Sequence, residues 1–233
     1  MKIEVLDHAD RVAERAAVFI AAEARAAVAA RGRFILAVSG GHTPWVMLRA
    51  LAGEEVPWEG VYVVQVDERV APAGHPDRNL THLRENLLEH APMRPEQLYA
   101  MPVEGKDIKA AAGRYALTLR KIAGSPPVLD LAHLGLGADG HTASLVPGDP
   151  VLEVVDADVA LTGVYQGRRR MTLTYPVLNR ARRILWLVTG AEKAGMLRRL
   201  REGDWSIPAG RVRREQALVL ADRKTAGELQ PKR

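Results

Sequence analysis

The sequence contains no cysteine, which excludes disulfide bonds, thiolate metal ligands and thiol nucleophiles. It also lacks any run of about 18 consecutive apolar residues, the minimum that a membrane-spanning helix needs. The first seven residues place acidic side chains among the apolar ones, unlike a secretory signal peptide. These absences predict a cytoplasmic protein with no membrane partner.

Aromatic residues and lysine are scarce as well. Phe, Trp and Tyr make up 5% of the chain, and the net charge of +5 arises from 26 arginines but only 7 lysines. The arginines cluster at 168–170, 180–183, 198–201 and 211–214. Surfaces that bind single-stranded nucleic acid combine basic with aromatic side chains, and these clusters contain no aromatic residues. We therefore predict no nucleic-acid partner, although a smaller anionic ligand is compatible with the charge.

The sequence does contain a regular alternation of short apolar segments with longer amphipathic ones. Strands are predicted at 2–6, 34–38, 61–66, 98–101, 131–136, 159–164, 170–175, 183–190 and 217–220. Helices are predicted at 8–31, 45–51, 78–90, 106–122, 176–181, 191–201 and from about 222. This order predicts an α/β fold with a mostly parallel sheet and helices on both faces. Because the 233 residues show no repeat or linker, we expect a single domain over 1–233.

The strongest functional signal follows the apolar run at 131–136. A glycine-punctuated loop there displays a carboxylate, an imidazole and two hydroxyls, from Asp139, His141, Thr142 and Ser144. Open α/β sheets bind their ligands beyond the carboxyl ends of the strands. A tight turn with solvated polar residues is the alternative, but the whole cluster favours a functional site. His133 lies within the strand itself and is expected to be a core histidine.

A second candidate site lies where the strand at 34–38 runs into Ser39-Gly-Gly-His-Thr-Pro44 and a helix. We expect Thr43 to be the N-cap and Pro44 the first helical residue. The N–H groups of Gly40 and Gly41 could then bind an anion near the positive end of the helix dipole. The spacing matches neither a Walker loop nor a dinucleotide fingerprint, and an ordinary strand–helix turn is the alternative.

Two more charged positions stand at predicted strand ends. Asp67-Glu68-Arg69 ends the strand at 61–66, and Lys193 lies in the first turn of the helix predicted at 191–201. A lysine at the sheet edge is notable in a chain with so few, although a surface lysine is the alternative. None of the candidate residues shows the spacing of metal ligands, so no metal site is predicted.

Five motifs follow one another along the chain: Ser39-Gly-Gly-His-Thr-Pro44, Asp67-Glu-Arg69, Gly135-Leu-Gly-Ala-Asp-Gly-His-Thr-Ala-Ser144, Arg170-Met-Thr-Leu-Thr174 and Thr189-Gly-Ala-Glu-Lys193. Their order and spacing resemble those of the 6-phosphogluconolactonase family. The sequence resembles this family from about residue 34 to the strand near 220. The block around His141 is specific to the family and its relatives, whereas the other motifs carry weight as a series. Two positions depart from the family pattern. Arg78 stands where a small polar residue usually precedes Asn79, and Val146 stands where Phe is usual.

The resemblance implies a modified Rossmann-like fold that binds no dinucleotide. It also implies hydrolysis of 6-phospho-D-glucono-1,5-lactone to 6-phosphogluconate, the second step of the pentose phosphate pathway. The family needs no metal or organic cofactor for this reaction. The partner implied is the small sugar-phosphate lactone, and no obligatory protein partner is predicted.

Chemical reasoning assigns roles to the motif residues. Opening a lactone needs a water nucleophile, a proton acceptor and stabilisation of an oxyanion. His141 is the candidate base, because a histidine's ordinary pKa of about 6.5 suits neutral pH. Asp139 or Asp67 would orient it, and Arg69 would stabilise the oxyanion or position the sugar. The phosphate would bind at Ser39, Gly40, Gly41, Thr43, Arg170 and Lys193.

Three further side chains leave their roles open. Ser144 is a possible nucleophile, but no nucleophile elbow surrounds it. His42 and His75 lie in loops near the candidate site, where either could touch the sugar.

Two alternative functions accompany the lactonase hypothesis. Glucosamine-6-phosphate deaminase shares the fold and the Asp-Gly-His block, but it has a glutamate shortly after the histidine and Asp-Glu-Tyr in the earlier motif. Val146 and Asp67-Glu68-Arg69 stand at those positions here, which favours the lactonase. A non-catalytic sugar-phosphate sensor is the second alternative, and the absence of any DNA-binding extension argues against it.

Overall fold

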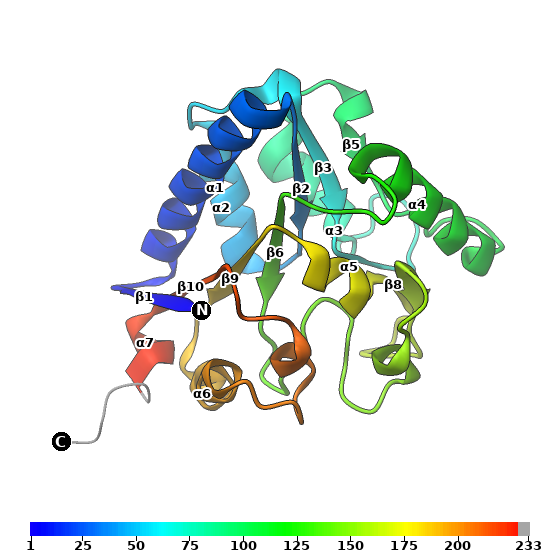
Figure 1. Ribbon diagram of the computed structural model, residues 1–233. Helices are drawn as coiled ribbons and strands as arrows, with labels where there is room; N and C mark the ends of the chain where they lie inside the picture. Colours follow the sequence, from blue (N-terminus) through cyan, green and yellow to red (C-terminus); the bar gives the residue numbers. More distant parts are fainter. Residues whose placement is uncertain (228–233) are drawn as a thin grey trace.

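A computed structural model describes residues 1–227 of the chain (Figure 1). Its centre is a seven-stranded sheet in which every neighbouring pair is parallel. In spatial order the strands are β1 (Lys2–Leu6), β10 (Ala217–Asp222), β9 (Arg183–Val188), β6 (Leu131–Gly135), β2 (Phe34–Val38), β3 (Val61–Gln65) and β5 (Leu98–Tyr99). The parallel α/β sheet predicted from the alternation of elements is confirmed.

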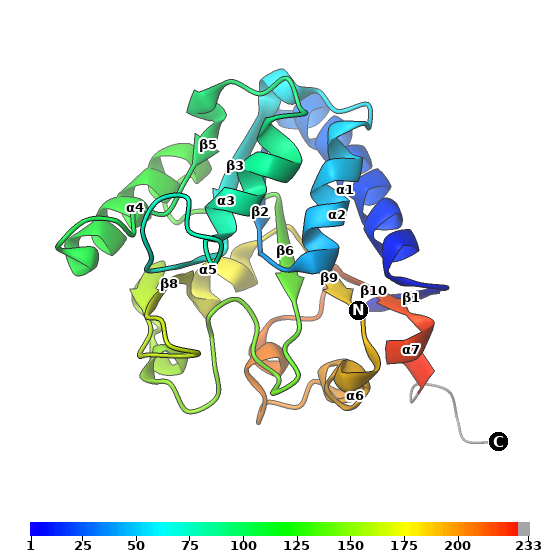
Figure 2. The same cartoon turned by 180° about the vertical axis from the view of Figure 1, so that it is seen from behind.

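Helices cover both faces of this sheet (Figures 1 and 2). One face carries α1 (Ala9–Arg31), α2 (His42–Ala52), α3 (Asn79–Leu83) and the π-helical turn η2 (Arg84–Leu88). The other carries α4 (Ile108–Ala123), α5 (Tyr175–Arg180) and α6 (Ala194–Glu202). Short 3₁₀ turns occur at Trp58–Gly60, Pro95–Gln97, Pro150–Glu153, Ala191–Lys193 and Pro208–Arg211, and α7 is Arg223–Ala226.

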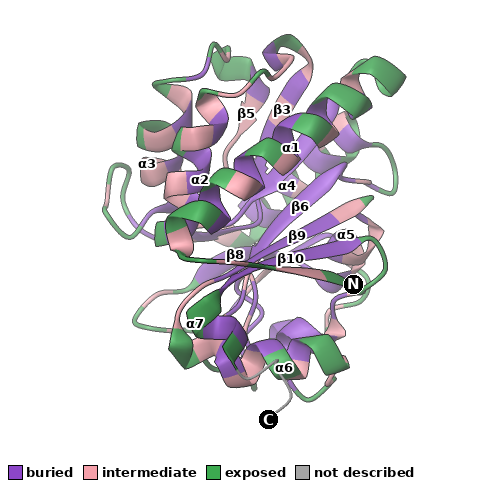
Figure 3. Cartoon of the chain, turned by 90° about the vertical axis from the view of Figure 1, so that its left-hand side faces the viewer, coloured by how far each residue is buried: buried purple, intermediate pink, exposed green. Residues whose placement is uncertain are grey.

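Successive side chains of each strand point to opposite faces of the sheet, so the sheet has a hydrophobic core on each face. In β2, Phe34, Leu36 and Val38 pack on the α1/α2 side, whereas Ile35 and Ala37 pack on the α4/α5 side. Strands buried on both faces need apolar side chains at every position, which is why these segments are continuous apolar runs. Figure 3 shows the same result, with buried strands between helices whose outer surfaces are exposed.

A second sheet was not expected from the sequence. It has three antiparallel strands in the order β4 (Asp67–Arg69), β8 (Arg170–Leu173) and β7 (Val159–Leu161). The predicted strand at 61–66 ends at Gln65, and Asp67–Arg69 is a separate strand whose Arg69 pairs with Arg170. The three charged residues therefore form a strand of their own and do not continue the parallel strand, because they pair with a segment about one hundred residues away. Asp67 and Arg69 still face the pocket beyond the end of β3, whereas Glu68 is buried.

The start of α2 also differs from the expectation. Gly41 is its N-cap and His42 its first residue, so Thr43 is not the N-cap and Pro44 occupies the third helical position. Proline is tolerated there, because the N–H groups of the first turn have no partner within the helix.

Other boundaries shifted without changing the order of elements. The helix predicted at 191–201 divides into the 3₁₀ turn at Ala191–Lys193 and α6. The last helix, predicted from about 222, begins as α7, and residues 228–233 of the expected domain lie outside the described residues. Within residues 1–227, no helix combines the length and the apolar character that crossing a membrane requires.

Candidate functional site

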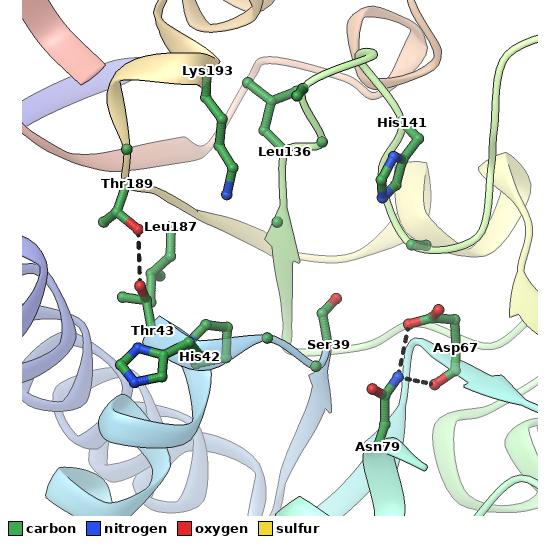
Figure 4. A pocket seen from close by; sticks show the side chains of 18 of the residues that line it. Ser39, His42, Thr43, Asp67, Asn79, Leu136, His141, Leu187, Thr189 and Lys193 are labelled. Atoms are coloured by element: carbon green, nitrogen blue, oxygen red, sulfur yellow. Dashed lines mark hydrogen bonds between the residues drawn. The ribbon is translucent and has the colours of Figure 1, made fainter. Parts of the chain in front are cut away.

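The loops that follow β2, β6 and β9 surround a pocket of about 610 Å³. These three strands are neighbours in the sheet, so their carboxyl ends open at the same edge. The small antiparallel sheet contributes Asp67, Arg69 and Arg170 to the lining. A pocket of this size suits a small-molecule ligand. In Figure 4, Lys193 and His141 reach into the pocket from separate loops, and Ser39 and Asp67 face it from other elements.

Nine of the ten residues predicted for the site line this pocket: Ser39, Gly40, Gly41, Thr43, Asp67, Arg69, His141, Arg170 and Lys193. The tenth, Asp139, lies behind His141 and contacts its ring. His42 lines the pocket as well, whereas His75 contacts Asp77 and Arg168 instead. The motif residues, distant in the sequence, are thus gathered around one cavity.

The Asp139–His141 pair has a defined geometry. Asp139 Oδ1 lies 2.6 Å from His141 Nδ1 and accepts the His141 main-chain N–H at 3.1 Å. Partial burial raises the pKa of Asp139, but hydrogen bonds and charge from His141, with a further hydrogen bond from Tyr165, outweigh it and lower the pKa below its usual value. An ionised Asp139 accepts the proton on Nδ1, which leaves Nε2 of His141 with its lone pair free. Asp139, rather than Asp67, is therefore the carboxylate that orients the ring in this structure.

Two glycines are required by close contacts with functional side chains. A Cβ on Gly137 would lie 2.1 Å from His141 Nδ1 and 2.7 Å from Asp139 Oδ1. A Cβ on Gly40 would lie 1.9 Å from Asn79 Oδ1. Any larger residue at either position would displace the side chain that it meets, so these glycines make room for the site.

Asp67 is held by hydrogen bonds that do not involve His141. Its Oδ2 accepts the Ser144 hydroxyl at 2.6 Å, and Asn79 Nδ2 donates to its carbonyl oxygen at 2.9 Å and to Oδ1 at 3.3 Å. Ser144 is fully buried and does not line the pocket, which argues against a nucleophilic role. Asn79 also accepts from Arg69 Nη1 at 2.9 Å and itself lines the pocket.

Sequence reasoning missed Asn79 as a site residue. It follows a loop rich in proline and glycine and begins a short helix. The family pattern around Arg78 marked the position, but the local sequence did not indicate that Asn79 would bridge Asp67 and Arg69. Gln166, Thr189, Glu192 and Asp222 line the pocket as well and were equally unrecognised. Thr189 and Glu192 lie inside the motif that ends at Lys193. That motif is the sequence signal that could have identified these two residues.

A buried ion pair supports this side of the pocket. Arg78 Nε lies 3.1 Å from Glu68 Oε2, and both side chains are almost inaccessible to solvent. Glu68 also accepts the main-chain N–H groups of Arg69, Asn79 and Leu80 at 2.8, 2.8 and 2.9 Å. Glu68 therefore ties β4 to the start of α3, and Arg78, which departs from the family pattern, compensates the buried negative charge.

Charged side chains of both signs line the pocket, and the carboxylates are those of Asp67, Glu192 and Asp222. Arg69, Arg170 and Lys193 line it, and Lys193 forms no ion pair within residues 1–227. Burial and the neighbouring charge of Arg69 both lower the pKa of Arg170. The repulsion between the two arginines would be relieved by an anionic ligand, which fits a phosphate-bearing substrate.

Two threonines add hydrogen-bonding groups to the lining. Thr43 Oγ1 and Thr189 Oγ1 are 2.8 Å apart and join the start of α2 to the loop after β9. No three His, Cys, Asp or Glu side chains in the described part of the chain gather closely enough to hold a metal ion.

The sequence model of the family described as glucosamine-6-phosphate isomerases/6-phosphogluconolactonase matches residues 7–220. The chain belongs to this family. The match begins at residue 7, well before residue 34, from which the five motifs indicated a resemblance. It therefore covers all of α1, the elements from β2 to β9, and most of β10.

Individual members of the family are similar to this chain in sequence and in fold. A 6-phosphogluconolactonase from Synechocystis sp. is 38% identical over 196 residues, which cover 82% of this chain and 81% of that protein. The crystal structure of a 6-phosphogluconolactonase from Thermotoga maritima has a TM-score of 0.82 at 27% identity and covers 95% of this chain and 98% of its own. The structure of a monomeric glucosamine-6-phosphate deaminase has a TM-score of 0.85 at 20% identity. The match covers 97% of this chain and 99% of that one. The fold is thus common to both kinds of enzyme, and the site has to discriminate between them.

Proposed function

We propose that this member of the family hydrolyses 6-phospho-D-glucono-1,5-lactone to 6-phospho-D-gluconate, the second step of the oxidative pentose phosphate pathway. The observation that carries the proposal is the Asp139–His141 pair, whose free Nε2 belongs to a pocket that also exposes Arg69, Arg170 and Lys193. The base suits hydrolysis of the lactone ester, and the cations in the same cavity suit the phosphate group of that substrate.

His141 carries the proton transfers of the proposed mechanism. Nε2 takes a proton from a water molecule as its oxygen attacks the C1 carbonyl, and the carbonyl oxygen becomes an oxyanion. Arg69 would stabilise that charge. Its Nη1 donates to Asn79 Oδ1 at 2.9 Å and to the Asp77 carbonyl at 2.8 Å, and these bonds fix the guanidinium group in the pocket wall before the charge develops. When the intermediate collapses, the bond from C1 to the ring oxygen breaks, and protonated His141 returns its proton to that oxygen. The products are the C5 hydroxyl and a carboxylic acid, which then ionises.

Asp139 supports the histidine in this scheme. It fixes the tautomer that leaves Nε2 unprotonated, and its charge stabilises the imidazolium formed during attack. Ser39, Thr43, Arg170, Lys193 and the N–H groups of Gly40 and Gly41 are proposed to hold the phosphate, as expected from the sequence.

The same site favours the lactonase over the deaminase. Val146, at the position where the deaminase carries a glutamate, is apolar and 4% exposed, and it does not line the pocket. Arg69, in place of the deaminase tyrosine, lines it. A non-catalytic sensor would need no oriented acid–base pair, so the Asp139–His141 geometry favours an enzyme.

The proposal is tested by adding purified protein to freshly prepared 6-phosphogluconolactone and following acid release. We expect acceleration well above the spontaneous opening of the lactone, measured in parallel without protein. Ammonia release from glucosamine 6-phosphate, without acceleration of lactone opening, would establish the deaminase instead. Binding of the sugar phosphate without either reaction would establish the sensor.

A further inference from the structure

The tip of the β7–β8 hairpin reaches the site although it lies outside all five family motifs. Tyr165 and Arg168 close a tight turn with main-chain hydrogen bonds of 2.9 and 3.2 Å. The two residues between them, Gln166 and Gly167, have φ values of 51° and 77°. Two consecutive positive φ values are typical of the compact turns that match the twist of a hairpin. The turn thereby directs Tyr165 to the Asp139–His141 pair and Gln166 to the pocket lining.

Tyr165 contacts both members of that pair. Its hydroxyl donates to Asp139 Oδ2 at 3.0 Å and lies 3.4 Å from His141 Nδ1. Its ring meets the imidazole edge to face, with centroids 5.5 Å apart and an interplanar angle of 66°. Asp139 therefore has one oxygen held by His141 and the other by Tyr165. A carboxylate with both oxygens engaged has little freedom to rotate, so it holds the imidazole in one orientation.

The same ring also contacts Arg170. The guanidinium carbon of Arg170 lies 4.9 Å from the ring centroid, and its Nη2 donates to Gln166 Oε1 at 3.0 Å. Tyr165 thus stands between the proposed base and a cation of the proposed phosphate site. A cation over an aromatic face is attracted to it, so the ring stabilises the position of Arg170.

We propose that Tyr165 is a positioning residue of this active site. Its hydroxyl fixes the Asp139 carboxylate so that His141 presents Nε2 to the pocket, and its ring supports Arg170. The kinetic part of this inference rests on the proposed lactonase activity, whereas the part that concerns the histidine's titration does not.

Removing the hydroxyl should change the titration of His141 in a defined direction. In the wild type, the hydroxyl donates to Asp139 and weakens the negative charge that the imidazole senses. Without it, Asp139 attracts a proton on His141 more strongly, so His141 becomes protonated at higher pH.

The other charged side chains that line the pocket are Asp67, Arg69, Arg170, Glu192, Lys193 and Asp222, from β4, β8, the segment after β9 and β10. Tyr165→Phe alters none of these charges. A shift in the titration of His141 would therefore report the lost hydroxyl.

The first experiment compares wild type, Tyr165→Phe and Tyr165→Leu. For Tyr165→Phe we expect kcat to fall about tenfold, as for loss of a hydrogen bond to a charged group, with KM within about twofold. The ascending acid limb of kcat/KM should move to higher pH. Tyr165→Leu also removes the ring beneath Arg170, so KM should rise in addition, by about fivefold.

Tyr62→Phe is the matched control. Tyr62 is a partly buried residue of β3 that does not line the pocket, and its hydroxyl forms no hydrogen bond within the described residues. We expect it to leave kcat, KM and the pH profile unchanged. Equal changes in both Phe variants would contradict a specific role for Tyr165.

The second experiment follows the imidazole by NMR and needs no substrate. The His141 signal is identified by its loss in His141→Asn, and its titration midpoint is compared between wild type and Tyr165→Phe. An upward shift supports the inference even if the wild type fails to accelerate lactone opening, which would overturn only the proposed function. An unchanged midpoint together with an unchanged kcat would overturn the role of Tyr165 while leaving the lactonase proposal intact.

Discussion

Two acid–base pairs belong to the same region of the molecule, but water reaches only one of them. The side chains of Arg78 and Glu68 are 2% and 0% exposed, whereas those of His141 and Asp139 are 24% and 38% exposed. Glu68 is surrounded by donors and fixes the main chain of two segments. His141 has Nδ1 engaged, whereas its Nε2 has no hydrogen-bond partner among residues 1–227. The buried pair is suited to fixing the main chain of β4 and α3, and the accessible pair is suited to exchanging a proton with a ligand or with water.

The loss of stability on breaking each pair should follow from its exposure to solvent. Breaking a buried pair leaves one charge without solvent or partner, which strongly destabilises the fold. Breaking a partly exposed pair costs little stability, because water solvates the remaining group. Mutation should therefore affect turnover at one pair and folding at the other.

The largest effect is expected for His141→Asn. Loss of the general base should lower kcat on the order of 10²–10⁴-fold with little change in KM, because the phosphate site is untouched. The free energy of unfolding should change by no more than about 0.5 kcal/mol. Steady-state kinetics, corrected for spontaneous opening, and denaturant unfolding check both statements. A folded variant with near-normal kcat would exclude His141 as the base and make Asp67 the next candidate.

Arg78→Met should show the converse behaviour. It leaves the Glu68 carboxylate buried without its cation, so we expect a loss of about 3–5 kcal/mol in the free energy of unfolding, measured with denaturant. The double variant Arg78→Met/Glu68→Gln removes the uncompensated charge and should recover part of that loss. If Arg78→Met unfolds like the wild type, the pair has no structural role of the kind inferred here.

Arg170→Ala and Lys193→Ala should mainly weaken substrate binding. Each deletes a charge-assisted hydrogen bond worth about 1.5–3 kcal/mol, which corresponds to roughly tenfold to a hundredfold in affinity. KM on the phosphorylated lactone measures the effect, and Arg11→Ala, at an exposed position of α1, serves as the control. Wild-type protein should use unphosphorylated gluconolactone poorly. Equal efficiency on both lactones would contradict a phosphate site at these residues.

The smallest effect concerns the second histidine of the same stretch. Burial lowers the pKa of His133 to about 3, and its Nδ1 accepts the Ser39 main-chain N–H at 3.2 Å. At pH values between that pKa and the unfolded-state pKa of about 6.5, the unfolded state binds more protons than the folded state. Lowering the pH in this range therefore lowers the free energy of unfolding by up to about 1.4 kcal/mol per pH unit. His133→Gln should remove this pH dependence and cost about 1–3 kcal/mol at neutral pH, with turnover retained. Denaturant unfolding between pH 4 and pH 7 tests it, and a pH dependence that persists in the variant would contradict it.

Local sequence was informative about the parallel sheet and the loops at its edge. The continuous apolar run Phe34–Val38 predicted a strand buried on both faces, and both faces are covered. Asp139 and His141 lie two residues apart in a glycine-rich loop, so their contact follows from local geometry. The expected Thr43 N-cap was wrong, because a helix start depends on where the preceding strand releases the chain, which local propensity does not specify.

Sequence reasoning failed where function depends on pairs that are distant in the chain. The pairing of Arg69 with Arg170 and the contact of Asp139 with Tyr165 join segments far apart in sequence. The pairing of β4 with β8 completes the second sheet. Strands were predicted at 159–164 and 170–175, but local sequence did not indicate that Asp67–Arg69 would pair with them.

The sequence by itself determined the α/β class, the order of the elements and the residues that gather at the strand ends, because hydrophobic periodicity and glycine placement act over a few residues. Only the tertiary structure decided that Asp67 binds Ser144 and Asn79 instead of His141, that Arg78 pairs with Glu68, and that Tyr165 contacts the Asp139–His141 pair. Those choices depend on distances and burial between separate segments, and such distances exist only once the chain has folded.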